Sequence, residues 1–211
     1  DNFTVDVGGL RYHVDPLKGQ KTGLYLDQAD NWAALRPFAK GGHVLDLFCH
    51  VGGFGLNASA AGAASVRCVD ASEPALAEVR KNMALNNLSR IETRQADAFD
   101  YVRARPGEFD LIVCDPPPFA RSRKQLEGAL RGYRELNRQC FKMLRPGGIM
   151  LSASCSAAVS GEDFDHMLQL SAADAGRTAR ILPGGGQPAD HPPLLGMPET
   201  HYLKTRIVMA D

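Results

Sequence analysis

The pattern that most constrains this chain is the repeated alternation of short apolar runs with helical stretches. HVLDLF, SVRCVD, IETRQAD and FDLIVC have the composition of strands, and each is followed by a turn and a helix-period segment. Strands that alternate with helices predict an α/β domain, in which helices cover both faces of an open, mostly parallel sheet. Ligands of such sheets bind at the carboxyl ends of the strands, near the switch in strand order.

Other segments precede and follow these four strands. Before them, Phe3 to Val14 alternates in polarity around Gly8-Gly9, which is typical of a β-hairpin. We therefore expect residues 1–30 to form a hairpin and a polar loop, and residues 31–211 to form the main domain. The later segments are expected to be a helix over 125–144 that stops at RPGG, a strand over 148–156, a loop over 182–200 and a closing strand in YLKTRIVMA.

Composition excludes several classes of protein. Lys plus Arg equals Asp plus Glu, 24 against 24, whereas nucleic-acid-binding domains are usually more basic. The five cysteines form no CxxC pair, which predicts reduced thiols in a cytoplasmic protein with neither a disulfide framework nor a zinc site. No apolar run approaches the roughly 20 residues of a membrane span, and no signal peptide opens the chain.

The first strand and the turn after it have the features of a nucleotide-type site. Asp46 lies near the end of the strand, and the glycines of the turn allow a sharp bend and close approach to a ligand. Asp70 ends the second strand, where it can accept hydrogen bonds from both ribose hydroxyls of an adenosine. Asp97-Ala98 ends the third strand, where a side chain and a backbone amide can contact the adenine edge.

Two cofactors compete for this turn. Residues 53–58 fit GxGxxA, the dinucleotide fingerprint. A carboxylate at the turn would repel a pyrophosphate, however, whereas Asp46 suits the positively charged amino-acid end of S-adenosylmethionine (SAM). The DPPPF segment after the fourth strand has no place in a hydride-transfer site, so the residues favour SAM over NAD. The alternative for Asp70 is a solvated charge after a strand.

The fourth strand ends in Asp115, which opens the segment DPPPF. Successive prolines hold a stiff loop with exposed carbonyls, and a rigid set of acceptors suits the amino group or ring of a planar base. Phe119 is placed to stack on that base. The alternative is a proline-rich turn with a packed aromatic ring.

The fifth strand ends in SCS, which contains Cys155. A thiolate at this edge can add to carbon 6 of a cytosine and make carbon 5 nucleophilic enough to attack a methyl donor. A small buried cysteine is the alternative, and spacing alone leaves both open. The other four cysteines are expected in the core: Cys49, Cys68, Cys114 and Cys140.

The combination of KTGLYLDQ, LDLFCHVGGFG, VDASEPAL, DPPPF, GYRELN and SCS resembles the bacterial 23S ribosomal RNA cytosine-5 methyltransferases, from about Phe3 to the C-terminus. The chain departs from the family's usual motifs at Ala29, at Cys49-His50-Val51 and at Pro118. The resemblance implies a Rossmann-like class I SAM-dependent methyltransferase fold. Full-length members also carry an N-terminal PUA-like RNA-binding domain, which is not visible in this sequence and whose absence would explain the neutral charge.

The resemblance also implies roles for individual residues. Cys155 would be the nucleophile, with Asp115 beside it in the catalytic site, and Gln28 with its loop would close over the cofactor. The expected SAM contacts are Gln28, Asp46, Phe48, Gly52, Gly53, Asp70, Ala71, Asp97, Ala98 and Asp115. The expected substrate contacts are Pro116, Pro117, Phe119, Arg121, Arg123 and Lys124.

Ribosomal RNA is the expected partner. The segment 120–134 contains five basic residues, the last two being Arg131 and Arg134, against the single acid Glu127, and such a patch can hold phosphates. A solvated helix face is the alternative. A homodimer is one arrangement that the sequence leaves open. Two other functions also stay open: methylation of a base nitrogen with Cys155 incidental, and an inactive homologue that binds SAM.

Overall fold

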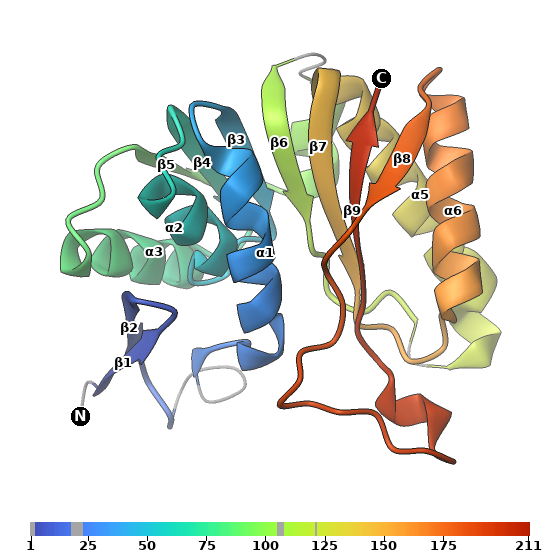
Figure 1. The fold of residues 1–211 in the computed structure, drawn as a ribbon, viewed down its shortest axis with the longest axis horizontal. Coiled ribbons are helices and arrows are strands. Elements are labelled where there is room, and N and C mark those ends of the chain that lie inside the picture. The colour runs from blue at the N-terminus through green and yellow to red at the C-terminus, as the bar shows by residue number, and fades with distance from the viewer. Residues whose placement is uncertain (1–2, 18–22, 105–107, 121) are drawn as a thin grey trace.

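A seven-stranded sheet forms the centre of the computed structural model, which describes residues 3–17, 23–104, 108–120 and 122–211 (Figure 1). The strand order is β5-β4-β3-β6-β7-β9-β8, and a two-stranded hairpin, β1-β2, lies apart from it. Neighbouring strands from β5 to β7 are parallel, and β9 runs antiparallel to both β7 and β8. The predicted α/β fold with a mostly parallel sheet is therefore confirmed.

Helices and strands follow one another in the predicted alternation. Within the ranges that the structure describes, no helix combines the length and the apolarity that crossing a membrane requires. The strands are β1 (Phe3–Val7), β2 (Leu10–Val14), β3 (His43–Leu47), β4 (Ser65–Asp70), β5 (Ile91–Gln95), β6 (Phe109–Cys114), β7 (Leu144–Ser154), β8 (Ala179–Leu182) and β9 (Lys204–Ala210). The α-helices are α1 (Ala29–Ala39), α2 (Gly53–Ala60), α3 (Glu73–Leu85), α4 (Ala98–Arg103), α5 (Leu126–Met143) and α6 (Gly161–Asp174), and the 3-10 helices are η2 (Leu26–Gln28), η3 (Arg123–Gln125) and η4 (Pro198–Thr200).

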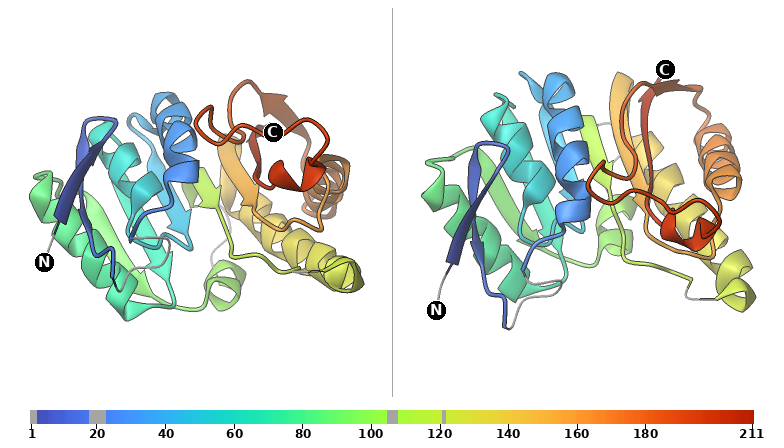
Figure 2. Two further views of the ribbon diagram at one scale, coloured as in Figure 1. Left: turned by 90° about the horizontal axis from the view of Figure 1, so that it is seen from below. Right: turned by 60° about the horizontal axis from the view of Figure 1, so that its bottom comes forward.

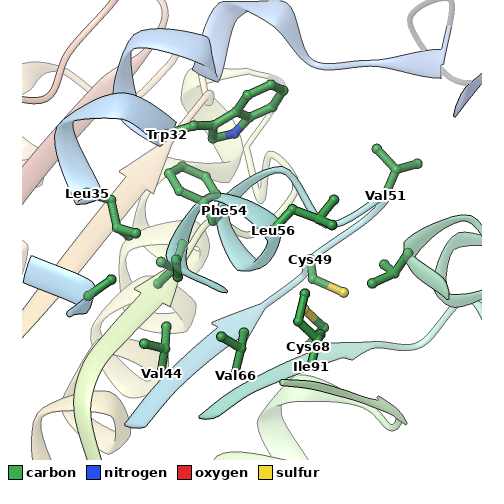
Figure 3. Close-up of a cluster of buried hydrophobic side chains, with 14 of the residues drawn as sticks. Trp32, Leu35, Val44, Cys49, Val51, Phe54, Leu56, Val66, Cys68 and Ile91 are labelled. Carbon is green, nitrogen blue, oxygen red and sulfur yellow. The ribbon is translucent and has the colours of Figure 1, made fainter. Parts of the chain in front are cut away.

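Two hydrophobic clusters lie on opposite faces of the sheet. Helices α1, α2 and α3 contribute to the first cluster, which Figure 3 shows around Trp32 and Phe54, and α4, α5 and α6 contribute to the second. Strand β3 alternates between them, because Val44 belongs to the first cluster and Leu45 and Leu47 belong to the second. This alternation places Asp46 on the face that α1 and α2 cover.

The topology fixes where a ligand is expected. The chain adds β4 and then β5 on one side of β3 and then returns to add β6 on the other side, so the switch in strand order lies between β3 and β6. Strand β7 lies next to β6. Because β9 is antiparallel to β7, its first residue, Lys204, pairs with the last residue of β7, Ser154. The amino end of β9 therefore shares the edge at which the parallel strands end.

The hairpin predicted before the main domain is confirmed, and it docks on α3 (Figure 2). Its turn uses two glycines with positive φ, Gly8 at 60° and Gly9 at 82°. The Asn82 and Asn86 side-chain oxygens of the α3 region accept hydrogen bonds from the His13 and Arg11 backbone N–H groups, at 2.7 and 2.8 Å. These bonds pair backbone groups that a two-stranded ribbon would otherwise leave to water.

Two boundaries differ from the sequence-based expectations. Strand β7 begins at Leu144 and not after RPGG, because Leu144 pairs with Phe109 and a register shift absorbs the extra residues, with Gly147 at a φ of 74°. Strand β8 was not expected, because it lies in the stretch just before the predicted loop over 182–200. Three of its four residues are exposed and it pairs with β9 alone, so it carries no apolar alternation that a sequence pattern could show.

Candidate active site at the carboxyl edge of the sheet

The turn after β3 has an unusual backbone. Phe48 and His50 have φ values of 59° and 48°, in a region that side-chain-bearing residues rarely adopt, and Gly52 has a φ of 88°. The Asp70 carboxylate at the end of β4 accepts the His50 N–H at 3.0 Å, and the Cys49 carbonyl accepts the Gly52 N–H at 2.8 Å. Strain of this kind persists where the surroundings fix it, and it is concentrated at functional sites.

Gly53 and Gly55, which begin α2, have a different reason to be glycine. A Cβ on Gly53 would lie 2.4 Å from the Trp32 ring, and a Cβ on Gly55 would lie 2.4 Å from the Cys68 sulfur. These glycines therefore let α2 pack tightly against α1 and β4, and their close approach to a ligand stays a prediction. Figure 3 shows Trp32, Phe54 and Cys68 around this helix. Of the glycines in the turn, Gly52 is the one whose φ requires the residue type.

Asp46 lies beneath the turn with only 1% of its surface exposed. Its Oδ2 accepts the Gly55 N–H at 2.8 Å, while no donor among the described residues reaches its Oδ1. Burial raises the pKa of Asp46 to about 8, against the opposing effect of the Gly55 N–H and with further increases from the charges of Asp115 and Asp70. Burial thus favours the protonated form of Asp46 in the free chain, and a positively charged donor at Oδ1 would favour the ionised form.

Asp70 and Asp97 lie at the ends of the next two strands. Asp70 is half-buried, and besides His50 it accepts the Ser72 N–H on Oδ1 at 2.9 Å, which leaves lone pairs on both oxygens. Asp97 caps α4 by accepting the Asp100 N–H at 3.1 Å. The predicted acidic residues of the cofactor site thus lie along one edge of the sheet, at the ends of β3, β4 and β5.

The segment that precedes α1 reaches across the switch point to β6. Gln28, only 4% exposed, donates from Nε2 to Asp115 Oδ2 at 2.9 Å, and its Oε1 accepts from Asn31 Nδ2 at 2.6 Å. Asn31 also bonds both the N–H and the carbonyl of Gly186, each at 2.9 Å. Gln28 therefore contacts a residue of the expected chemistry site directly. The first two residues of KTGLYLDQ, Lys21 and Thr22, lie outside the described residues.

Tyr133 on α5 joins the loop after β6 to the loop after β7. Its hydroxyl shares a hydrogen bond of 2.9 Å with the Ser156 hydroxyl and accepts the Phe119 N–H at 3.4 Å. The Ser156 hydroxyl also accepts the Ala120 N–H at 3.3 Å. The structure thus brings the loop of DPPPF and the loop of SCS together. Cys155, in the second of these loops, is half-buried. The other four cysteines are buried, so their predicted place in the core is confirmed.

The Phe119 ring belongs to an aromatic cluster. Its centroid lies 4.5 Å from that of Tyr133 and 5.9 Å from that of Phe99. Aromatic packing of this kind fixes the ring and the loop that carries it. The proline loop is therefore anchored on α5, and stacking of Phe119 on a base stays a proposal.

The expected basic patch has two kinds of cation, those paired with local acids and those without such a pair, and its contact with phosphates stays a prediction. Arg134 forms a two-bond ion pair with Asp174, at 2.6 and 2.9 Å, and Arg131 pairs with Glu127. Arg123 and Lys124 lie exposed on η3, and Arg121 lies outside the described residues. Local acids thus neutralise the two charges on α5, and the part of the patch open to phosphates is at η3.

Sequence reasoning missed several polar residues of this edge. Asn31, Tyr133 and Lys204 are each at most 4% exposed, although each lies in a segment whose other buried residues are mainly apolar. A polar residue at a core position of a helix or strand is a usable signal, because such groups are retained only when hydrogen-bonded. The sequence could not show which atoms they bond.

A doubly wound sheet with carboxyl groups at or next to the ends of β3, β4 and β6 is typical of α/β folds that bind a nucleotide or a related ligand at this edge. Residues 1–182 match the model of the S-adenosylmethionine-dependent methyltransferases, and the chain belongs to this family. It is 43% identical over 205 residues to the protein named ribosomal RNA large subunit methyltransferase I from Shewanella frigidimarina, and 44% identical over 207 residues to that from Tolumonas auensis. These alignments cover 95% and 96% of this chain but 52% of each relative, so the chain spans about half their length.

Solved structures agree on the fold. A Streptococcus mutans protein assigned as a SAM-dependent methyltransferase superposes with a TM-score of 0.86 at 23% identity, over 99% of this chain and 55% of that one. A SAM-dependent methyltransferase from Agrobacterium tumefaciens gives 0.72 at 20% identity, over 99% of this chain and 69% of the other. At these identities the likeness shows the fold alone.

Proposed function

We propose that this chain is the catalytic part of a methyltransferase that transfers a methyl group from SAM to carbon 5 of a cytosine in ribosomal RNA of the large subunit. Two observations support the proposal. The relatives at 43% and 44% identity are named for methylation of that RNA, and Cys155 lies at the edge of the sheet where open α/β sheets bind their ligands.

Cys155 carries the proposal. It directly follows β7, and hydrogen bonds through Tyr133 and Ser156 tie its loop to the loop that begins at Asp115. Bound SAM supplies an electrophilic methyl group. The Cys155 thiolate adds to carbon 6 of cytosine, carbon 5 then takes the methyl group, and loss of the carbon-5 proton to a base expels the thiolate. Asp115 and the proline loop would hold the cytosine through its amino group and ring.

The residues of β3, β4 and β5 fit the cofactor. Asp46 has a buried Oδ1 that no donor among the described residues reaches, which suits the ammonium of the amino-acid end of SAM. Asp70 keeps free lone pairs for ribose hydroxyls, and Asp97 with Ala98 would contact the adenine. In this arrangement Gln28 would close over the cofactor from the α1 side while holding Asp115.

The test of the reaction is methyl transfer to a fragment of 23S ribosomal RNA by Cys155→Ser, with nucleoside mass spectrometry of the product. We expect the rate to fall on the order of 10³-fold or more, because the variant loses its nucleophile. Ala157→Ser, an exposed change two residues away, is the matched control and should keep the rate. Full activity of Cys155→Ser would exclude the cytosine-5 mechanism, and a product methylated on a base nitrogen would replace it.

The cofactor is tested separately by calorimetry. SAM should bind the unmutated chain better than NAD does, and Asp70→Ala should weaken SAM binding by roughly 10- to 100-fold, through loss of hydrogen bonds to a charged acceptor. Glu162→Ala, an exposed acid on α6, is the control. Tighter binding of NAD would contradict the assignment of the site.

A further inference from the structure

Lys204 is a lysine in the core, with 4% of its surface exposed. It begins β9 and pairs in register with Ser154, the residue before Cys155. Its Nζ donates to the carbonyl of Ser156, the residue after Cys155, at 2.7 Å, and to the Tyr202 carbonyl, also at 2.7 Å. The backbone and the side chain of Lys204 therefore hold the chain on both sides of Cys155.

Burying the ammonium group of Lys204 costs free energy, and a neutral donor could bond the carbonyls of Ser156 and Tyr202 equally well. The two hydrogen bonds alone therefore do not explain why a charged residue lies here. Burial lowers the pKa of Lys204 to about 8, and a negative charge on Cys155 acts in the opposite direction. Interaction between two titrating groups is reciprocal, so the ammonium favours the Cys155 thiolate to the same degree. The charge of Lys204 thus has an electrostatic partner at the proposed nucleophile.

Two tyrosines also face Cys155, one from α5 and one from the segment before β9. Burial is the main cause that raises the pKa of Tyr133 and of Tyr202, and the charge of Cys155 contributes to both. The Tyr202 hydroxyl donates to Asp27 at 2.8 Å. Both phenols are neutral at pH 7, whereas Lys204 brings a positive charge to Cys155.

We propose that Lys204 is the positioning residue of the nucleophile: it fixes the loop that carries Cys155 and supplies the charge that favours the thiolate, whose proton passes to solvent. This inference rests on the proposed function for its role in turnover. The proximity of the charge to the thiol can be tested without RNA or SAM.

The experiment measures the rate at which iodoacetamide alkylates Cys155 across pH 5 to 10, by mass spectrometry of the peptide. Lys204→Gln keeps a hydrogen-bond donor without the charge, Lys204→Met removes both, and Lys204→Arg keeps the charge. We expect the midpoint of the pH profile to rise by about one pH unit or more in the Gln and Met variants, which is about tenfold slower alkylation at pH 7. Arg should restore most of the rate, and Lys142→Met, on the exposed side of α5, should leave the profile unchanged.

An unchanged midpoint in Lys204→Gln, with the variant folded by circular dichroism, would overturn the proposal. So would a change in rate that is equal at every pH, because that result reports exposure of the thiol and not its ionisation. The proposed function fails by a different result, namely full methyl transfer by Cys155→Ser. A shifted midpoint together with an active Cys155→Ser would support the pairing of Lys204 with Cys155 and reject the role of Cys155 in turnover.

Discussion

The two halves of the carboxyl edge are built differently. In the half formed by β3, β4 and β5, each acidic side chain lies near the end of its own strand, and backbone N–H groups of the turns after these strands donate to the carboxyl groups. In the half formed by β6, β7 and β9, groups from distant segments converge on one place. Gln28 contacts Asp115, Tyr133 contacts Ser156, and Lys204 contacts the same residue from the other side.

The difference follows from strand direction. Parallel strands place their carboxyl ends on one edge, so a polar residue after an apolar run is enough to locate a site. Strand β9 is antiparallel, and it therefore brings its first residue to that edge. The half formed by β3, β4 and β5, which we call the cofactor half, is accordingly a local structure. The half formed by β6, β7 and β9, which we call the chemistry half, depends on long-range side-chain bonds. Substitutions in the first half should change stability or cofactor binding, and those in the second should change methyl transfer.

The largest expected effect concerns Asp46 in the cofactor half. Its pKa of about 8 in the folded chain lies far above the value of about 3.9 expected when the chain is unfolded. Between these values the folded chain keeps a proton that the unfolded chain has lost, so stability falls as pH rises, by about 1.4 kcal/mol per pH unit. Asp46→Asn removes this titration, and the stability of wild type relative to the variant should fall by about 3 kcal/mol from pH 5 to pH 7.

Urea unfolding of the ligand-free chain at 25 °C, in a pH series, measures this difference. Glu162→Gln, an exposed change, should run parallel to wild type. If the difference in the free energy of unfolding between wild type and Asp46→Asn were constant with pH, Asp46 would be ionised in the folded chain. Asp46 would then titrate like an ordinary surface carboxylate, and the prediction would be wrong.

The next effect concerns the packing of α2. Gly55→Ala would place a methyl group 2.4 Å from the Cys68 sulfur and 3.2 Å from Asp46 Oδ2, and should cost roughly 1–3 kcal/mol of stability. Gly128→Ala on α5 is the matched control, because its nearest atom is 3.9 Å away, at the end of the Arg131 side chain. There the same change should stabilise by about 0.5–1 kcal/mol. Denaturant midpoints measure both, and equal effects would contradict the tight packing.

Part of the site and of the sheet could be predicted from the sequence, and part could not. Asp46, Asp70 and Cys155 were located because each ends an apolar run of a parallel strand, and the sheet follows from the same alternation. The packing role of Gly53 and Gly55 could not be predicted, since the atoms that exclude a Cβ belong to Trp32 and Cys68, which lie in other elements of the chain. Strand β8 was missed because an exposed edge strand has no buried face, and Lys204 was missed because its strand was not known to be antiparallel.

The smallest effect compares the half formed by β6, β7 and β9 with the hairpin that packs beside the other half, because the same substitution is available in both. Tyr12→Phe in the hairpin removes the hydroxyl that accepts from Asn57 Nδ2 at 2.9 Å, and Tyr133→Phe removes the hydroxyl that bonds Ser156 at 2.9 Å. Both tyrosines are fully buried, so each variant should lose about 1 kcal/mol of stability. Only Tyr133→Phe unties the loop of Phe119 from the loop of Cys155, so methyl transfer to RNA should fall severalfold in that variant alone, with SAM affinity by calorimetry unchanged in both. An equal loss of methyl transfer in Tyr12→Phe would mean that the hairpin and the chemistry half act as one unit, and that the long-range bonds around Cys155 have no separate part in the reaction.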